Sequence, residues 1–313
     1  MASNWKTEIP NLIVLALLIV VLLVVLTKFQ WVHCSQIPGW CGIYCDTIMR
    51  SHSRVAMIYG EDGTGSAAAL ENVIREYRPQ TYIEPLSADM LSTNALKNYD
   101  LIIMEHMRTL SSRQSQAIMN YVNRGGTLVW VGDAASAHYY DPYDLQYAFT
   151  QNETFYAELE ADLVKRNLNE TLNSTYAQSR ISAFEKTPYA VILANKDNLT
   201  IGFSNMSVVI AARYVKTEPL PKNSNLSIIS RDHMLVRGLN PNIAMPVVNF
   251  TIVNINPAAP VELIASVKTP DKKTYPAIFE TRYAGRIIYF AFPLENLQSI
   301  TLLTNLLDYL VPC

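Results

Sequence analysis

Short apolar segments alternate with helix-like segments between residues 54 and 133, and this alternation constrains the fold more than any other feature of the chain. The expected strands cover 54–60, 81–87, 99–106 and 127–133. Apolar residues at helical spacing predict helices over 65–77, 88–98 and 110–126. Strands that are apolar throughout and separated by helices form parallel sheets with helices on both faces. We therefore predict an α/β fold with a mostly parallel sheet.

Residues 137 to about 222 interrupt this alternation. They begin with a tyrosine-rich stretch, and a polar segment over 153–186 predicts a helix. The segments 189–195 and 207–215 have the composition of strands. We expect an inserted α+β segment that lies over the sheet. Further strands and a closing helix over 297–311 then complete the domain, which spans 54–313.

The N-terminal region contains an uninterrupted apolar run from Leu12 to Leu26. Trp5 and Trp31 flank it, and at the helical rise they would lie roughly 39 Å apart, close to the thickness of a bilayer with its headgroups. A cleaved signal peptide is the alternative, but no A-x-A-like site follows the run. We predict a short tail over 1–8 and a single transmembrane helix over 9–30, with the lipid bilayer as its partner.

Potential glycosylation sites indicate on which side of the membrane the body lies. Seven asparagines begin an N-x-[ST] sequence, against roughly three expected by chance. They are Asn152, Asn169, Asn173, Asn198, Asn205, Asn225 and Asn249. Charges that flank the apolar run are too few to orient it. We therefore expect a glycosylated body outside the cytoplasm, in a single-pass protein of the cell membrane.

The cysteines agree with that location. Three of them lie in the segment 31–53, which we interpret as a membrane-proximal linker, and the fourth is the last residue. They are Cys34, Cys41, Cys45 and Cys313. Four cysteines allow three pairings, between which the sequence does not choose. A zinc site that uses His33 is the alternative, but the spacing matches no common zinc pattern. Outside the cytoplasm, disulfides are the expected state.

Charge and motifs exclude several classes of ligand. The formal net charge is -2 and no basic run is present, which argues against nucleic-acid binding. The segment 60–66, "GEDGTGS", opens a helix, but Glu61 and Asp62 would repel a phosphate and no lysine follows to bind one. We expect no cofactor and assign no metal.

Polar residues gather where the expected strands end. Glu61 and Asp62 follow the first strand, Glu105 and His106 the third, and Asp133 the fourth. Such ends meet at one edge of a parallel sheet, so these groups are candidates for a ligand site, a cation site or acid–base catalysis. The simpler interpretation is that they cap the following helices.

Other residues give weaker indications. Ser136 is a possible hydrolase nucleophile, but no G-x-S-x-G surrounds it. His138 stands beside tyrosines and is expected to pack against them. The tyrosines at 139, 140, 143 and 147 suit either an aromatic platform for a glycan or a protein, or packing of the insertion. His233 is interpreted as structural.

Three segments together resemble a class I glutamine amidotransferase-like domain, and most of all its trehalose-utilisation-type branch. They are "YDLIIMEHMRTLSSRQSQAIMNYVNRGGTLVWVGD", "RDHMLVRGL" and "GRIIYFAFPLE…LLTNLLDYL". The resemblance covers roughly 54–136 and 225–312. It implies a flavodoxin-like sheet, with any ligand at the carboxyl ends of the strands.

The catalytic motifs of that family are altered here. Active members carry G-x-C-x-G after the strand that ends at 132, where this chain reads Gly132-Asp133-Ala134-Ala135. They also carry F-H-P-E, where this chain reads Phe292-Pro293-Leu294-Glu295. Thiol and histidine are both missing, so glutaminase activity is not expected.

The sequence thus favours a non-catalytic binding or scaffolding module of a cell-envelope complex, with protein partners and with a glycan or small molecule as a further possible ligand. The alternative is an extracytoplasmic hydrolase or metal-dependent enzyme that acts through Asp133, Glu105 and His106. Substitution of Asp133 by asparagine separates the two, because catalysis would fall by orders of magnitude and binding would not.

Overall fold

The computed structural model describes residues 5–28, 32, 37, 40, 43–44, 48, 53–77, 81–165, 172, 174–196, 200–201, 207–296 and 299–311. Its centre is a nine-stranded sheet in the order β10-β9-β12-β13-β14-β5-β3-β1-β2. Two smaller sheets, β11-β8 and β4-β6-β7, lie beside it. The predicted α/β class is confirmed, with one large sheet at its core.

One half of the large sheet is parallel. Its strands are β2 (Tyr82–Ser87), β1 (Arg54–Tyr59), β3 (Leu101–Met104), β5 (Thr127–Val131) and β14 (Arg286–Phe290), all paired in parallel in that order. This order has the flavodoxin-like pattern in which the second strand lies outside the first. β1 and β3 are buried along most of their length, as their apolar composition predicts.

The other half of the sheet is antiparallel. Its strands are β13 (Thr274–Arg282), β12 (Val261–Lys268), β9 (Asn225–Ile228) and β10 (Asn242–Ala244). The connections 269–273 and 283–285 are short, and a parallel crossover needs a dozen residues or more. Loop length therefore makes β13 antiparallel to both β12 and β14. β8 (Ala212–Pro219) and β11 (Asn249–Ile255) form the separate antiparallel pair.

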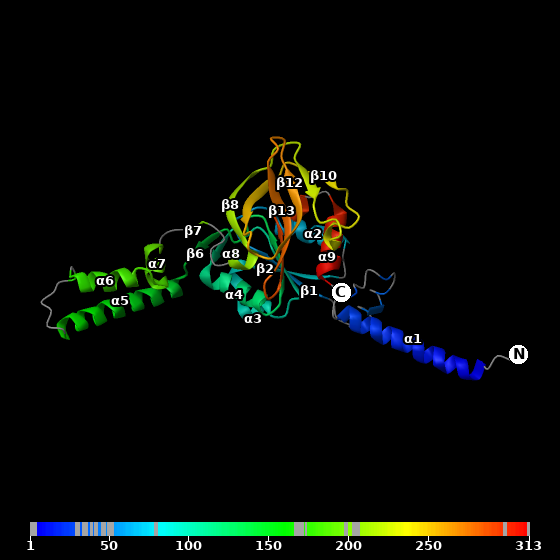
Figure 1. The fold of residues 1–313 in the computed structure, drawn as a ribbon, viewed down its shortest axis with the longest axis horizontal. Helices are drawn as coiled ribbons and strands as arrows, with labels where there is room; N and C mark the ends of the chain where they lie inside the picture. The colour runs from blue at the N-terminus through cyan, green and yellow to red at the C-terminus, as the bar shows by residue number, and fades with distance from the viewer. Residues whose placement is uncertain are drawn as a thin grey trace.

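Helices cover both faces of the parallel half, as predicted (Figure 1). α2 (Ala67–Tyr77) and α9 (Ile300–Leu310) lie on one face, whereas α3 (Thr93–Leu96) and α4 (Ser112–Asn123) lie on the other. The expected helix over 88–98 consists of two turns, the 3-10 turn η3 (Ala88–Met90) and α3. The short strand β4 (Thr109–Ser111) precedes α4, and Ser111 and Gln114 begin that helix with a reciprocal capping box.

The apolar N-terminal run forms helix α1 (Trp5–Lys28), which begins before the predicted position at residue 9. Its window Pro10–Thr27 has a mean hydropathy of 2.9 and is almost fully exposed. The helix has the length and apolarity of either a membrane anchor or a signal sequence. Trp40 packs back onto its end and donates a hydrogen bond from Nε1 to Thr27 Oγ1 at 2.9 Å. All four cysteines lie outside the described residues.

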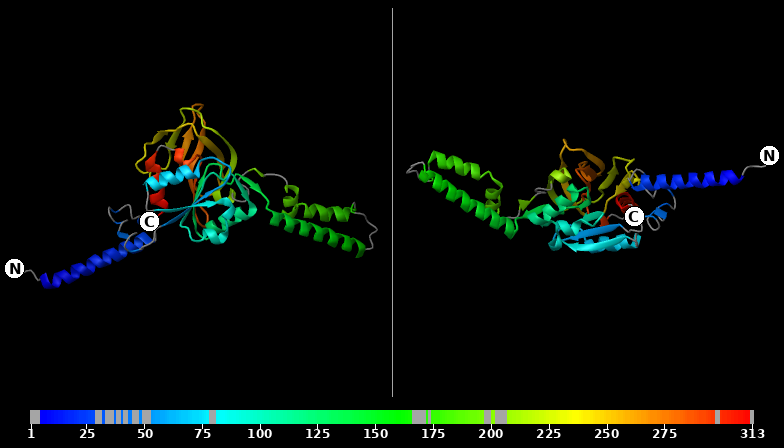
Figure 2. Two further views of the ribbon diagram at one scale, coloured as in Figure 1. Left: turned by 180° about the vertical axis from the view of Figure 1, so that it is seen from behind. Right: turned by 90° about the horizontal axis from the view of Figure 1, so that it is seen from below.

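The insertion is mainly helical and projects away from the sheet, which corrects the expectation that it lies over it (Figures 1 and 2). After β6 (Ala137–Tyr139) come α5 (Pro142–Lys165), α6 (Thr175–Phe184) and α7 (Pro188–Ala194). We call residues 142–194 the arm. The chain returns through β7 (Thr200–Ile201) and α8 (Ser207–Ile210). The arm has its own small core, in which Leu159, Leu163 and Ala177 are buried.

The strand predicted over 189–195 was wrong, and the strand predicted over 207–215 was wrong in its first part. The segment 189–195 lies in helix α7 and its C-cap, because Thr187 caps α7 and Pro188 occupies its first turn, where proline favours a helix start. The segment 207–215 begins with the helical turn α8, and its strand starts only at Ala212.

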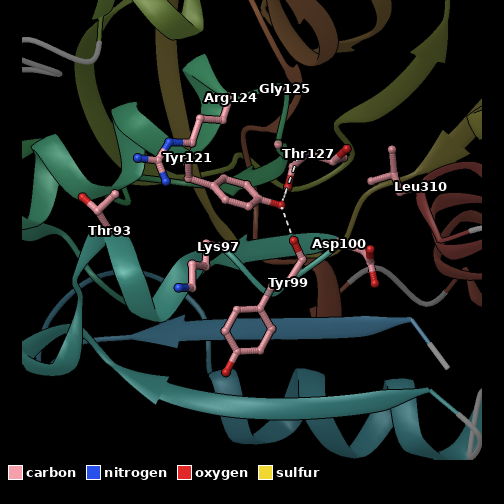
Figure 3. A pocket seen from close by; sticks show the side chains of 10 residues that line it. Thr93, Lys97, Tyr99, Asp100, Tyr121, Arg124, Gly125, Thr127 and Leu310 are labelled. Carbon is pink, nitrogen blue, oxygen red and sulfur yellow. Dashed lines mark hydrogen bonds between the residues drawn. The ribbon is translucent and has the colours of Figure 1, made fainter. Parts of the chain in front are cut away.

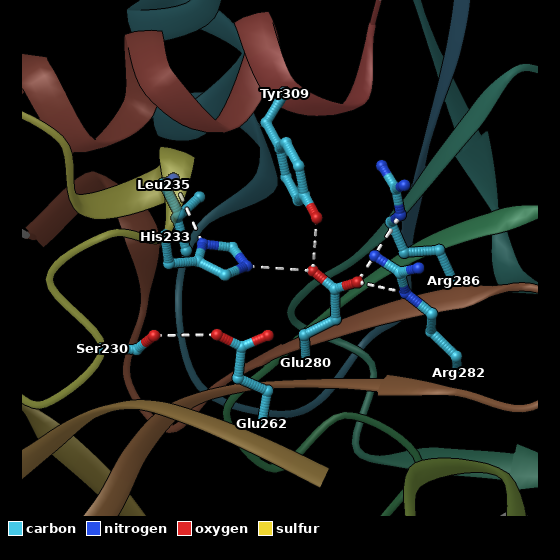
Figure 4. A network of polar contacts seen from close by, with 8 residues as sticks. All are labelled: Ser230, His233, Leu235, Glu262, Glu280, Arg282, Arg286 and Tyr309. Carbon is cyan, nitrogen blue, oxygen red and sulfur yellow. Dashed lines mark hydrogen bonds and ion pairs between the residues drawn. The ribbon is translucent and has the colours of Figure 1, made fainter. Parts of the chain in front are cut away.

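A buried carboxylate ties β13 to the C-terminal helix (Figure 4). Glu280 Oε2 accepts a hydrogen bond from Tyr309 Oη at 2.8 Å and lies 3.2 Å from His233 Nε2. Its other oxygen lies 2.9 Å from Arg282 Nε and 3.6 Å from Arg286 Nε. Burial by itself raises the pKa of Glu280, but the hydrogen bonds from His233, Arg282 and Tyr309 outweigh it and lower the pKa to about 2. His233 thus has the structural contacts expected from the sequence.

Glu280→Gln is expected to destabilise the body by about 2–4 kcal/mol at neutral pH, since it removes the charge that several donors share. Because folding lowers this pKa, the stabilisation is present above the unfolded-state pKa and is lost as the pH falls towards 2. Chemical denaturation of both proteins between pH 7 and pH 2 measures this. The two free energies of unfolding should converge at the acid end.

Glu262→Gln is the matched control for this experiment. Glu262 lies on the neighbouring strand β12, is exposed, and accepts a hydrogen bond only from Ser230. It should change stability by less than about 0.5 kcal/mol. Equal effects of the two substitutions would contradict the assigned role of Glu280.

Candidate functional site

Three loops meet at the carboxyl edge of the parallel strands, and they contain the polar residues singled out in the sequence. Residues 60–66 follow β1, residues 105–108 follow β3 and residues 132–136 follow β5. In open α/β sheets, ligands bind at this edge, where the strand order reverses. Here the reversal lies between β1 and β3, so the topology identifies this edge as the candidate site.

Backbone hydrogen bonds join the three loops directly. Gly60 N donates to His106 O at 2.8 Å, and His106 N donates to Thr64 O at 3.1 Å. Ala135 N donates to Met107 O at 2.8 Å. These three backbone N–H groups are therefore already paired within the protein.

Asp133, the leading catalytic candidate from the sequence, is used to hold one loop against another. It is buried, and its Oδ1 accepts hydrogen bonds from both N and Oγ1 of Thr64, each at 2.8 Å. The contact depends on Gly132, which has a φ of +59° and whose missing Cβ would lie 2.3 Å from Thr64 Oγ1. A side chain at 132 would therefore push the two loops apart.

Asp62 makes a similar contact with the loop after β3. Its carboxylate accepts hydrogen bonds from Thr109 N at 3.0 Å and from Thr109 Oγ1 at 2.5 Å. Glu61, next to it, is exposed. The two acids that follow β1 therefore differ, because one is bound to the protein and the other faces solvent.

A third carboxylate reaches this edge from the far end of the chain. Glu295, in the 3-10 turn η6 (Leu294–Asn296), accepts a hydrogen bond at 2.8 Å from Ser66 N, directly before α2. Beside it lies Glu105, which is fully buried and whose two oxygens have no hydrogen-bond partner. Gly65 packs on that side chain, since a Cβ there would lie 2.6 Å from Glu105 Oε1.

Glu105 and Glu295 form a carboxyl pair in which the pKa of Glu105 is raised. Burial, and then the neighbouring charge of Glu295, raise the pKa of Glu105 to about 10. Glu105 is therefore protonated at neutral pH. A neutral acid beside a carboxylate is an arrangement that some enzymes use for proton transfer. Here the proposed acid has no access to solvent.

The turn after β5 carries two alanines at the place where the resemblance implied a catalytic cysteine. Ala135 has a φ of +56°, a conformation that costs energy in a residue other than glycine. Ala134 and Ala135 are buried, and Trp130 Nε1 donates to Ala134 O at 2.7 Å. The side chains of Ala134 and Ala135 are methyl groups, which cannot attack a substrate.

Ser136 and His138 lie two residues apart on one chain segment, and both are buried. Neither Ser136 Oγ nor His138 Nε2 has a hydrogen-bond partner, so the two are not joined as a nucleophile and its base. The His138 ring contacts Tyr140 edge-on at 4.8 Å, which confirms the packing expected for it. Burial lowers the pKa of His138, and the charges of Asp144 and Asp141 oppose this only in part.

His106 completes the predicted set. It has a φ of +52°, and its Nδ1 is buried without a hydrogen-bond partner. Within the described part of the chain, no three His, Cys, Asp or Glu side chains are grouped so as to hold a metal ion. The structure brings the loops of Glu105, His106 and Asp133 together, but it directs Asp133 to a protein donor.

Sequence reasoning missed the residues that receive these carboxylates. Thr64, Thr109 and Ser66 supply the donors, and Gly65 makes room for Glu105. Only Glu295 gave a sequence signal, as the remaining member of a motif that has lost its histidine. The glycines of 60–66 suggested a phosphate loop, whereas two of them allow close contacts within the protein.

One family model matches most of the chain. The family model described as "ThuA: Trehalose utilisation" matches residues 55–292. No curated protein matches the chain. A thua-like protein from Bacteroides uniformis is 13% identical with a TM-score of 0.48, and the match covers 83% of this chain and 92% of that one.

Two further solved structures are similar to the chain. A thua-like protein from Parabacteroides merdae is 10% identical with a TM-score of 0.46, over 83% of this chain and 89% of that one. A cold-adapted β-galactosidase from Rahnella sp. R3 is 13% identical with a TM-score of 0.48. That match covers 82% of this chain but only 31% of the galactosidase.

Asp133→Ala is expected to destabilise the protein by about 1–3 kcal/mol, because it leaves the buried N–H of Thr64 without an acceptor. Asp133→Asn keeps an acceptor oxygen and should cost less. Chemical denaturation measures both, and hydrogen exchange at residues 60–66 should be faster in the alanine variant. If the amides of residues 60–66 exchange at the parent rate in Asp133→Ala, the contact between Thr64 and Asp133 does not hold this loop in place.

Glu105→Gln tests the buried acid. Because folding raises this pKa, the folded state holds a proton that the unfolded state has lost, and stability should fall as the pH rises from about 4.5 towards 10. The glutamine variant lacks this loss and should be more stable than the parent at pH 8, by about 1–3 kcal/mol. Free energies of unfolding between pH 5 and pH 9 check this.

Glu105→Met distinguishes ionisation from packing, because methionine also cannot ionise but fills the site differently. Both variants should remove the same part of the pH dependence. If they keep the parent's slope, Glu105 is not the group that titrates.

Proposed function

The chain belongs to the ThuA (trehalose utilisation) family, whose domain has the class I glutamine amidotransferase-like fold, and from that premise we propose that it is a non-catalytic, membrane-anchored member. Its body would lie outside the cytoplasm and serve as a binding or scaffolding module of a cell-envelope complex. The geometry of the candidate site supports this function, and helix α1 and the exposed side chains of the arm support the anchoring and the partner surface.

The observation that carries the proposal is the closed state of the carboxyl edge. The elbow after β5 presents buried alanines instead of a nucleophile. Asp133 and Glu295, which would otherwise face a ligand, accept hydrogen bonds from the neighbouring loop. A catalytic group must contact its substrate. Asp133 and Glu295 accept hydrogen bonds from the protein instead, and Glu105, Ser136 and His138 are buried.

Helix α1 and the arm lie at opposite ends of the molecule, which supports membrane anchoring at one end and partner binding at the other. α1 and the arm leave the body in opposite directions, so anchoring through α1 would place the arm on the side away from the bilayer (Figures 1 and 2). Three of the seven potential glycosylation sites fall on described residues. Asn225 and Asn249 are exposed and Asn152 is half-buried, and exposed asparagines suit a glycosylated surface.

The arm offers the partner surface. Tyr143 is 76% exposed and Val164 is 71% exposed, although both are apolar enough to be buried in most proteins. Tyr140, by contrast, packs against His138, and Tyr147 contacts Tyr189 although it is still 49% exposed. Some tyrosines of this segment therefore pack within the protein, whereas others are exposed. Tyrosine is enriched in protein interfaces.

A second candidate function rests on the Glu105–Glu295 pair. The pKa of Glu105 is raised to about 10, so this side chain could act as a general acid. A hydrolase that also uses Asp133 and His106 would need such an acid. Its complete burial opposes this function, because a substrate could reach the pair only if the three joined loops opened.

Native mass spectrometry of the full-length protein, extracted from its own membrane in mild detergent, separates the two functions. We expect stoichiometric protein partners and no metal or small ligand. Asp133→Asn should leave the partner fraction unchanged within about twofold. A single chain that carries a metal or a small molecule would contradict the proposal in favour of the enzyme.

Variants of the arm test the proposed surface in the same experiment. Tyr143→Ser with Val164→Ser should remove most of the partner, since exposed apolar anchors dominate such interfaces. Tyr283→Ser is the matched control, because Tyr283 is 58% exposed but lies on the body. Loss of partner in the control alone would place the interface elsewhere.

A further inference from the structure

The amino edge of the parallel strands, opposite the candidate site, carries a cavity of about 350 Å³ (Figure 3). Its lining includes Thr93, Lys97, Asp100, Tyr121, Arg124 and Thr127. These residues come from the starts of β3 and β5 and from the ends of α3 and α4. None of them belongs to the carboxyl-edge loops, so the cavity is a separate site.

Tyr121 forms a rigid wall of this cavity. Its hydroxyl lies 3.2 Å from Tyr99 O and 3.2 Å from both N and O of Thr127. The ring packs directly on Gly126, where a Cβ would lie 2.3 Å from Tyr121 Cε1. The hydroxyl is thus fully used within the protein, and a ligand would have to bind to the other polar side chains.

Those side chains are divided by charge. Lys97 and Arg124 are exposed, and neither forms an ion pair with any described residue. In Figure 3 they lie with the Thr93 hydroxyl on one side of the cavity, whereas Asp100 lies on the other. Two cations and a hydroxyl form a donor set that matches the oxygens of a phosphate group.

The cavity lies where the chain enters the body from α1. Arg54, the first residue of β1, donates its backbone N–H to Asp100 Oδ2 at 3.0 Å. Only 25 residues lie between Arg54 and the last residue of α1, Lys28. Leu310, at the end of α9, lines the same cavity. Figures 1 and 2 show α1 leaving the body on this side.

We propose that this cavity binds a phosphate group, held by Lys97, Arg124 and Thr93, and that the headgroup of a phospholipid presents it. The phosphate chemistry follows from the donor set alone. The lipid as its source rests on the proposed membrane anchoring, because only an anchored body keeps this edge at the bilayer surface. Binding there would fix the orientation of the body on the membrane and keep the arm away from it.

A matched pair of lipids tests the proposal on the full-length protein in detergent. Dioctanoyl phosphatidylglycerol carries the phosphate, and dioctanoylglycerol lacks it. Native mass spectrometry titrations should show that the phosphate-bearing lipid binds at least about tenfold more tightly. Lys97→Gln with Arg124→Gln should remove that preference. Lys222→Gln with Arg231→Gln, two exposed cations outside the cavity, should leave it unchanged.

Glycerol 3-phosphate, titrated in the same way, distinguishes the source of the phosphate. If it binds as tightly as the lipid and is lost in the Lys97/Arg124 variant, the cavity is a phosphate site for a soluble ester. If only the lipid binds, the headgroup is the ligand. Equal binding of the two lipids, or a preference that survives in the Lys97/Arg124 variant, would overturn the proposal.

Carbonate extraction of membranes separates this proposal from the proposed function. A chain that resists extraction but shows no phosphate preference would leave the anchoring intact and remove the phosphate site. A chain that is extracted but still binds glycerol 3-phosphate through Lys97 and Arg124 would do the reverse.

Discussion

The two hydrogen bonds from Thr64 to the buried carboxylate of Asp133 hold the loop after β1 against the loop after β5. Other contacts join further segments at the same edge. Glu295 accepts a hydrogen bond from Ser66 N, and Gly65 lies against Glu105. Since a buried polar group without a partner costs about 1–3 kcal/mol, the paired carboxylates help to fix the closed arrangement.

Closure of this edge changes what the fold can do. Ligands of flavodoxin-like folds bind where the strand order reverses, and here the protein's own side chains occupy that position. The turn after β5 has a left-handed backbone at Ala135, and the side chains at 134 and 135 are buried methyl groups. The polar groups of Asp133 and Glu295 hold neighbouring loops together.

Helix α1 and the arm lie at opposite edges of the body. The anchor-like helix α1 and the cavity at Tyr121 lie at the amino edge, whereas the arm begins at the carboxyl edge. This separation follows from chain direction, because parallel strands begin at one edge and end at the other. The C-terminal helix returns to the amino edge, and the buried Glu280 network joins it to β13. Contacts with a membrane and with a partner can therefore be made at opposite ends.

The sequence by itself determined the α/β class, the parallel half of the sheet and the apolar N-terminal helix, because these depend on local composition and periodicity. The strand ends of Glu105 and Asp133 were also predicted, since apolar runs stop there. Only the tertiary structure decided what those acids contact. Thr64 is 69 residues from Asp133 and Ser66 is 229 residues from Glu295, so no local pattern relates them. The helical arm and the direction of β12 and β13 were likewise decided by capping, loop length and packing, which act between segments and not within them.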